Sequence, residues 1–340
     1  FDSAANIRCA VIGYGGAFNM GRAHLKQMQD AGMSPVAVAE LDPERLEIAK
    51  TDFPGIQVFT TVEEMLKTAS PDLVAIITPH NTHADLSMQC LDAGASVVCE
   101  KPMAITLDEC DRMIARAKEN NLLLSVYHNR HWDGCILEAV DRIQNRKQIG
   151  EVFRVEAHMG GFSQPGDWWR SSRSISGGIH YDWGVHLIEY TLQLIDSHVV
   201  EVSAFAKEGV WSTKWGDDTN QDELSAIVRF ANGALFNLRL THLDADPNPG
   251  QVVATGTRGK YRMDQVTYEL HHVVDGETVI RKGKNRTGEQ HKYYENVAAT
   301  LTGREQFVIT PEWSRRTMEI LAMATESAKQ GRAIRVDAAG

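Results

Sequence analysis

Cysteine, long hydrophobic runs and basic clusters are all scarce in this sequence. The five cysteines are odd in number and show no Cys-x-x-Cys spacing, which argues against a disulfide framework or a zinc knuckle. No apolar run is long enough to span a bilayer, and residues 1–6 lack the features of a signal peptide. The net charge of -10 comes without a run of lysine or arginine, which argues against nucleic acid or an anionic membrane as partner. We therefore expect a cytoplasmic protein that binds a small molecule.

The length of 340 residues and the hydrophobic fraction of 43% predict two domains, because single cores rarely grow to this size. In the first third, short apolar segments alternate with amphipathic ones, a pattern typical of βαβ units on a doubly wound parallel sheet. The expected strands are 7–12, 36–39, 57–59, 73–77, 96–99 and 123–126, and the expected helices are 22–30, 44–52, 62–68, 84–93 and 107–120.

The pattern changes after Tyr127, so we divide the chain into an α/β domain, residues 1–127, and an α+β domain, residues 128–340. A helix is expected at 137–146 and another at 311–329. Strands with alternating polarity are expected at 152–159, 199–205, 224–230, 234–241, 251–256, 259–264 and 267–274. Turn residues such as Asn232-Gly233 separate them, which predicts a mostly antiparallel sheet.

A glycine cluster follows the first expected strand. Gly13 permits a tight turn, and Gly15 lets the backbone approach a pyrophosphate at the start of a helix. With Gly16 and Gly21, these residues are the candidate cofactor-binding turn. Residues 16–20 separate Gly15 from Gly21, which is longer than the G-x-G-x-x-G spacing, so an ordinary strand-to-helix turn stays open for this motif alone.

Glu40 stands at the end of the second expected strand. A carboxylate there can accept hydrogen bonds from both ribose hydroxyls of a dinucleotide and repel a 2′-phosphate, which favours NAD over NADP. Alternatively, Glu40 or Asp42 only caps the helix that begins near Pro43.

The segment Glu100-Lys101-Pro102 ends the strand 96–99 at the sheet edge where α/β proteins bind ligands. Pro102 restricts Lys101 to extended geometry, so we expect the lysine to project into the cleft. The alternative is a surface lysine in a turn.

Asp182 and His186 are four residues apart, so on a helix the carboxylate can orient the imidazole. Oxidation of a secondary alcohol needs a base for the hydroxyl proton, and a nearby ammonium stabilises the developing alkoxide. Two alternatives are a surface Asp/His pair and a zinc site formed with His180. Since no further ligand completes such a site, no metal is expected.

Aromatic and polar residues near these segments suggest a ring-shaped polyol. Flat aromatic faces suit a pyranose or cyclitol, although tryptophans also fill cores. The residues concerned are Trp132, Trp168, Trp183, Trp211 and Trp215. The polar run 128–133 contains Arg130 and His131, which are candidates for binding hydroxyl or anionic groups of the substrate.

Together these segments resemble the Gfo/Idh/MocA family, that of glucose-fructose oxidoreductase and inositol dehydrogenase. The resemblance extends from about Ile7 to the C-terminal region. It rests on residues 10–15 with Gly21 and His24, Thr78-Pro79-His80-Asn81-Thr82-His83, Glu100-Lys101-Pro102, Trp169-Arg170 and residues 177–186.

The resemblance implies a Rossmann domain and a C-terminal domain whose large open sheet builds homodimers or homotetramers. It implies an NAD(P)-dependent dehydrogenase or reductase acting on CH–OH groups of a sugar, sugar derivative or cyclitol. Lys101 and His186 would be catalytic, assisted by Asp182, and Glu189 stands where an aspartate is usual in the family. Thr78, Pro79, His83, Glu100, Lys101, Trp169 and Arg170 would surround the cofactor, and the catalytic residues with Arg130, His131 and Trp168 would bind the substrate.

Two other activities stay open. An NAD-dependent glycoside hydrolase or lyase of this family oxidises the sugar transiently, eliminates the aglycone and reduces the product again. A redox-sensing protein would bind NAD without chemistry, but the presence of both Lys101 and His186 disfavours it.

Overall fold

The computed structural model describes residues 1–16, 18–247 and 251–336. The chain forms two compact units, of which the first contains residues 1–129 and 291–316. The second contains residues 130–290 and the chain from 317 onward. A single division after Tyr127 was predicted; the structure adds a return of the chain to the first unit near its end.

The first unit is built on a six-stranded parallel sheet with the order β3-β2-β1-β4-β5-β6. Its strands are β1 (Arg8–Ile12), β2 (Ser34–Ala39), β3 (Gln57–Phe59), β4 (Leu73–Ile76), β5 (Ser96–Cys99) and β6 (Leu124–Val126). This order is that of a dinucleotide-binding Rossmann sheet, and it reverses direction between β1 and β4. All of β4 and β5 is buried, so their apolar runs form the centre of the core.

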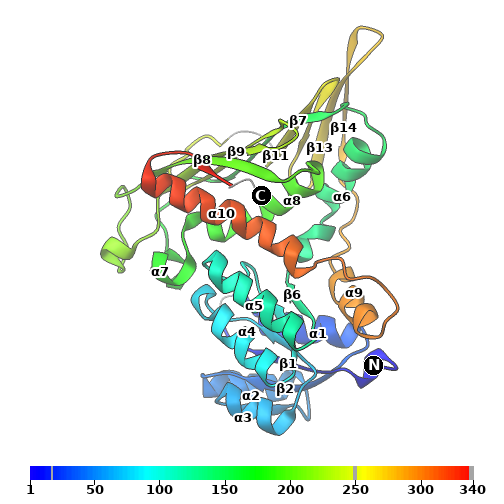
Figure 1. Ribbon diagram of the computed structural model, residues 1–340, viewed down its shortest axis with the longest axis vertical. Helices are drawn as coiled ribbons and strands as arrows, with labels where there is room; N and C mark the ends of the chain where they lie inside the picture. The colour runs from blue at the N-terminus through cyan, green and yellow to red at the C-terminus, as the bar shows by residue number, and fades with distance from the viewer. Residues whose placement is uncertain (17, 248–250, 337–340) are drawn as a thin grey trace. The chain divides into compact units, whose positions relative to one another are not determined.

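Helices cover this sheet. They are α1 (Met20–Asp30), α2 (Pro43–Asp52), α3 (Val62–Ala69), α4 (His83–Asp92) and α5 (Leu107–Glu119). Thr106 and Glu109 form a capping box at the start of α5. The returning chain adds α9 (Lys292–Leu301), which lies beside α1 (Figure 1) and which was not predicted.

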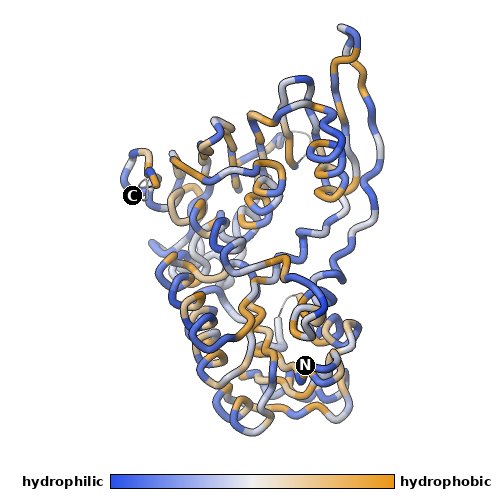
Figure 2. The backbone as a smooth tube through the Cα atoms, turned by 45° about the vertical axis from the view of Figure 1, so that its right-hand side comes forward, coloured by the Kyte–Doolittle hydropathy of each residue, from blue (hydrophilic) through white to orange (hydrophobic). Residues whose placement is uncertain are grey.

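The second unit contains a nine-stranded sheet with the order β14-β13-β12-β11-β7-β10-β9-β8-β15. The strands are β7 (Val152–Gly160), β8 (Val199–Lys207), β9 (Glu223–Phe230), β10 (Leu235–Thr241), β11 (Val252–Gly256), β12 (Gly259–Met263), β13 (Thr267–Val274), β14 (Glu277–Lys284) and β15 (Ile334–Arg335). Among the described residues of this sheet, only β7 and β10 pair in parallel, so the predicted mostly antiparallel sheet is confirmed. In the long β13–β14 hairpin, most of the hydrophobic residues lie near the turn (Figure 2).

Helices α6 (Gly134–Val140), α7 (Arg173–Ser176), α8 (Trp183–Leu194) and α10 (Pro311–Gln330) complete the two units. The helix expected at 137–146 begins earlier and ends in a π-helical turn over Asp141–Asn145. In the second unit α8 packs on β7 and β10, where Val155, Phe236 and Leu238 are buried. Among the described residues, no helix combines the length and the apolar character needed to cross a membrane.

Candidate active site

The carboxyl ends of four neighbouring strands in the first unit carry the predicted cofactor residues. The backbone ladder continues one residue beyond each strand: Gly13 N donates to Ala39 O, Glu40 N to Phe59 O, Ile77 N to Ile12 O and Glu100 N to Ile76 O, all at 2.8 to 3.0 Å. The turns that follow β1, β2, β4 and β5 therefore begin side by side at one sheet edge, next to the point where the strand order reverses. This is the position at which open α/β sheets bind ligands.

Close packing explains the glycines of the first turn. A Cβ atom on Gly13 would lie 2.1 Å from Ile77 O, and the φ of Gly13 is +93°. A Cβ on Gly21 would lie 2.5 Å from Gly13 O, so α1 starts directly against the turn. Around Gly15, in contrast, the three atoms nearest to an added Cβ belong to side chains: Arg45 Nε and Glu40 Oε2 at 3.4 Å and Arg45 Cδ at 3.5 Å. No backbone packs against Gly15 at such short range, which suits the approach of a pyrophosphate to the turn. Ala17 of the lengthened loop lies outside the described residues.

Glu40 and Asp42 have separate roles. Asp42 is the N-cap of α2, where its side chain accepts from Glu44 N. Glu40 instead accepts from Tyr14 N at 2.7 Å with one carboxylate oxygen, and from Leu41 N at 2.6 Å and Asp42 N at 3.1 Å with the other. Because a carboxylate has about four lone-pair sites, these three donors fix the orientation of Glu40 and leave it capacity for a ribose hydroxyl.

The Glu100-Lys101-Pro102 step follows β5, and its Lys101–Pro102 peptide bond is cis. Glu100 Oε2 accepts from the Lys101 backbone N at 3.0 Å, and Glu100 Oε1 lies 3.1 Å from His24 Nε2. Burial by itself raises the pKa of Glu100, but the hydrogen bond from His24 and the charge of Lys101 outweigh it, so the pKa lies below its ordinary value. Glu100 is therefore ionised, and its carboxylate binds the backbone of Lys101.

His83 ties the loop after β4 to the Glu-Lys-Pro step. The ring is fully buried, with Nδ1 2.7 Å from Pro102 O and Nε2 3.0 Å from Thr78 O. In the same loop, the hydroxyl of Thr82 contacts Thr78 Oγ1 and Pro79 O, both at 2.7 Å. His83 thus connects the two loops that carry Thr78 and Lys101 through its two ring nitrogens.

In the second unit, Asp182 and His186 lie at the start of α8. Asp182 is the N-cap residue rather than a helical one, and His186 follows one turn later. The Arg170 guanidinium lies 3.9 Å from the Asp182 carboxylate and about 5 Å from the rings of Trp168 and Trp169. The His186 ring packs edge-on against Trp183 at 5.6 Å and His186 is 6% exposed, whereas 36% of the Asp182 side chain is exposed.

His180 does not join a metal cluster with Asp182 and His186. Its Nε2 lies 2.8 Å from the Thr325 hydroxyl, and burial lowers its pKa to about 4. In the part of the chain that the structure describes, no three His, Cys, Asp or Glu side chains are grouped so that they could hold a metal ion.

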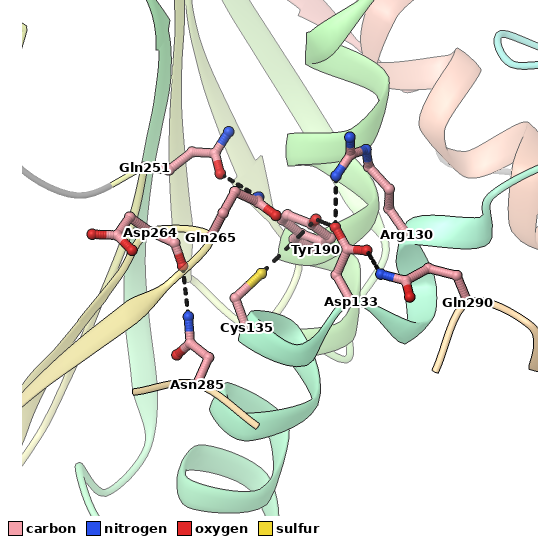
Figure 3. Close-up of polar contacts among 9 residues, drawn as sticks. All are labelled: Arg130, Asp133, Cys135, Tyr190, Gln251, Asp264, Gln265, Asn285 and Gln290. Atoms are coloured by element: carbon pink, nitrogen blue, oxygen red, sulfur yellow. Dashed lines mark hydrogen bonds and ion pairs between the residues drawn. The ribbon is translucent and has the colours of Figure 1, made fainter. Parts of the chain in front are cut away.

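Arg130 is held in place by a buried network in the second unit. Figure 3 shows Arg130, Tyr190 and Gln290 converging on Asp133, whose carboxylate accepts from Arg130 at 2.8 Å and from Tyr190 at 2.5 Å. Burial first, and the charge of Asp133 in addition, raise the pKa of Tyr190, so its hydroxyl stays protonated and donates. The guanidinium lies 4.7 Å from the centre of the Trp183 ring, and 32% of the Arg130 side chain is exposed.

His131 has a buried partner that its sequence position does not reveal. Its Nδ1 lies 2.6 Å from Glu189 Oε1, and the Glu189 carboxylate also accepts from Gln193 Nε2. Glu189 is 1% exposed, so this pair is part of the α8 packing. The His131 ring also packs against buried Trp132 at 4.8 Å.

Comparison with known families assigns both parts of the chain. Residues 7–128 match the oxidoreductase family model with an NAD-binding Rossmann fold, and residues 137–262 match the GFO/IDH/MocA C-terminal domain. The chain belongs to the Gfo/Idh/MocA family. The family and the fold class expected from the sequence are confirmed, and with them an NAD-binding oxidoreductase.

Three relatives show how far the Gfo/Idh/MocA likeness extends. The "uncharacterized oxidoreductase C26H5.09c" of Schizosaccharomyces pombe is 37% identical over 148 residues, 43% of this chain and 40% of that protein. The "scyllo-inositol 2-dehydrogenase (NADP(+)) IolW" of Bacillus subtilis is 25% identical over 97% of this chain and 96% of its own. The crystal structure of an NAD-binding protein from Listeria innocua has a TM-score of 0.82 at 26% identity, covering 97% of this chain and 96% of that one.

The structure of this Gfo/Idh/MocA chain fits the NAD cofactor that the family implies. The bare backbone at Gly15, the fixed carboxylate of Glu40 and the aligned strand ends form a cradle for a dinucleotide. Sequence reasoning missed Arg45, which flanks Gly15, and Tyr190, which orders Arg130. Neither carries a local signal, because both become relevant only through contacts between distant segments.

Proposed function

We propose that this protein is a dehydrogenase that oxidises a secondary alcohol of a cyclitol or sugar with NAD, using Lys101, Asp182 and His186. One observation carries the proposal above all. The glycine turn follows β1 and the Glu-Lys-Pro step follows β5, with only β4 between these two strands, so both begin at one edge of the sheet. This is the edge at which open α/β sheets bind ligands, which supports a reaction beside Lys101. The inositol dehydrogenase among the relatives supports the substrate class.

Each residue has a distinct part in the proposed reaction. When bound, NAD supplies the acceptor for the hydrogen of the alcohol carbon. The imidazole of His186 takes the hydroxyl proton, and the carboxylate of Asp182 stabilises the resulting imidazolium. The ammonium of Lys101 holds the alcohol oxygen and stabilises the negative charge that develops on it. Arg130, fixed on the Trp183 face, and His131 and Trp168 bind the rest of the polyol.

A substrate screen tests this function. The protein is incubated with NAD and scyllo-inositol, myo-inositol, pyranoses or glycosides, and NADH is followed by absorbance while products are separated by chromatography. We expect NADH to accumulate with at least one polyol. Release of an aglycone without net NADH would identify the hydrolase or lyase alternative instead, and no turnover of any polyol or glycoside would contradict both.

We further propose that NAD rather than NADP is the working cofactor. The wild-type protein is expected to bind NADH about tenfold more tightly than NADPH, because the Glu40 carboxylate repels a 2′-phosphate. Glu40→Gln removes that charge and is expected to reduce the preference below about threefold. Arg45→Ala should weaken both nucleotides, since its guanidinium is the cation beside Gly15, where the pyrophosphate that they share would lie. Fluorescence titration with both nucleotides measures these ratios.

The control for this comparison is Glu47→Gln, which removes an equal charge from the exposed side of α2. It should leave both affinities unchanged. A wild-type protein that binds NADPH more tightly than NADH would contradict the proposed role of Glu40.

We also propose a homodimer or homotetramer formed through the nine-stranded sheet, in a reducing cytoplasmic compartment. Helix α8 packs on one face of this sheet, while Phe205, Ile227 and Leu235 are exposed on the other. These side chains lie on the adjacent strands β8, β9 and β10. Ile227 is opposite Ser203 and Asn237, and Phe205 and Leu235 lie diagonally from Ile227, opposite Ser225 and Arg229. A second copy would cover this face of the sheet.

Ile227→Arg is expected to shift the mass measured by light scattering from the oligomer to the monomer, because it places a charge in the middle of that surface. Ile48→Arg is the matched control, since Ile48 is 46% exposed on α2 and Ile227 is 49% exposed. A wild-type protein that is monomeric at all concentrations would contradict this arrangement.

A further inference from the structure

A buried chain of hydrogen bonds connects the returning helix α9 to the Glu-Lys-Pro step. The Tyr294 hydroxyl lies 2.5 Å from His24 Nδ1, and His24 Nε2 lies 3.1 Å from Glu100 Oε1. The other oxygen of Glu100 accepts from the Lys101 backbone N. These contacts, all within the first unit, join residues that are far apart in the sequence.

The direction of the protons in this chain follows from the partners. An ionised Glu100 can only accept, so His24 Nε2 carries a proton and donates it. Burial raises the pKa of Tyr294 well above its ordinary value, so this hydroxyl keeps its proton. Tyr294 has no other hydrogen-bond partner among the described residues, and leaving the proton unpaired in the core is costly. Tyr294 therefore donates to His24 Nδ1.

Packing holds this chain in a single arrangement. His24 and Tyr294 are both fully buried. The Tyr127 ring lies 4.1 Å from the His24 ring, and the Tyr294 ring meets the same imidazole edge-on at 5.7 Å. Because both ring nitrogens are bonded and the ring is fully buried against Tyr127 and Tyr294, His24 is held in one orientation, and it holds the Glu100 carboxylate that it contacts.

We propose that Tyr294 and His24 are positioning residues that orient Lys101 through Glu100. They do not touch the substrate. They fix the carboxylate that binds the Lys101 peptide and thereby fix the direction in which the lysine leaves the sheet edge. This inference rests on the proposed catalytic role of Lys101.

The neighbouring tyrosine provides a matched control. Tyr293 is also buried on α9, but its hydroxyl donates to Ser125 Oγ at 2.7 Å and not to His24. Tyr293→Phe and Tyr294→Phe each remove one buried hydroxyl from the same helix. If both hydroxyls only stabilise the fold, the two changes should have similar effects on the Lys101 amide and on turnover. If Tyr294 positions Lys101, only Tyr294→Phe should change them.

The first experiment needs no substrate. In protein labelled with 15N-histidine, His24 should show a protonated Nε2 and a hydrogen-bonded Nδ1, and Tyr294→Phe should move the Nδ1 resonance downfield. In protein labelled with 15N-lysine, Tyr294→Phe should accelerate hydrogen exchange of the Lys101 amide about tenfold or more. Tyr293→Phe should leave both signals unchanged. Unchanged His24 and Lys101 signals in Tyr294→Phe would overturn the inference.

The second experiment uses turnover of scyllo-inositol with NAD. Tyr294→Phe should lower kcat about tenfold with the Kd for NAD within about threefold, and in the His24→Gln background it should lower kcat by less than about a further twofold. Additive effects, or an equal loss in Tyr293→Phe, would overturn the inference. If the Lys101 amide responds as expected but Lys101→Ala retains turnover, the result supports the hydrogen-bond chain from Tyr294 to Glu100 and contradicts the proposed catalytic role of Lys101.

Discussion

Lys101→Ala is expected to reduce turnover at least about a thousandfold while the Kd for NAD stays within about tenfold. The ammonium contributes most strongly when charge develops on the alcohol oxygen, so its loss affects kcat more than binding. Single-turnover measurements with the best substrate of the screen, together with NAD titration, separate the two quantities. Lys118→Ala, an exposed lysine of the same unit, is the control.

His186→Ala is expected to have an effect of similar size for a different reason. Without the imidazole, the hydroxyl proton has to leave to water, and a positioned base contributes on the order of a hundred- to ten-thousandfold. His198→Ala changes an exposed histidine beyond the end of α8 and should leave turnover unchanged. Full activity of either the Lys101 or the His186 variant would refute the role assigned to that residue.

Gly13→Ala is expected to abolish NAD binding and to lower the free energy of unfolding by roughly 3 kcal/mol or more. Two effects add here. The positive φ strains any residue with a side chain, and the new methyl would overlap the Ile77 carbonyl, which itself belongs to the backbone ladder at the sheet edge. Thermal unfolding and NADH fluorescence measure the two losses.

Gly16→Ala separates strain from collision. Gly16 has nearly the same φ, +91°, but nothing within 4 Å of the added Cβ. It should therefore show only the conformational penalty, about 1 to 2 kcal/mol. Equal losses in the two variants would mean that close packing against Ile77 is unimportant for the turn.

The parallel sheet was predictable because its strands are buried on both faces. Residues Leu73–Ile76 and Ser96–Cys99 read as short apolar runs between amphipathic segments, and both were predicted within one residue. In contrast, β14 was missed, since Glu277–Lys284 at the sheet edge carries charged residues and is mostly exposed. Helix α9 was also missed, because its N-cap residue is His291 and not one of the residues that usually mark a helix start in a sequence.

The same distinction applies to the candidate site: short sequence motifs predicted some of its residues, whereas contacts between distant segments could not be predicted. Glycines at a turn, an acid at a strand end and a lysine before a proline follow from short motifs. The contact between His24 and Tyr294 joins residues 270 positions apart, and no spacing rule connects them. The support of Arg130 by Tyr190 likewise depends on how α6 meets α8, which only the folded chain decides.

The return of residues 291–316 bears on how the protein is made. On the ribosome, the segment 1–129 emerges first, yet the hydroxyl of its buried Ser125 is paired with Tyr293, and its His24 with Tyr294. The nucleotide-binding half therefore cannot close its interior until residues 291–316 have been synthesised. A shortened gene that stops after β6 would encode a Rossmann sheet without α9, in which Ser125 and His24 lack their tyrosine partners.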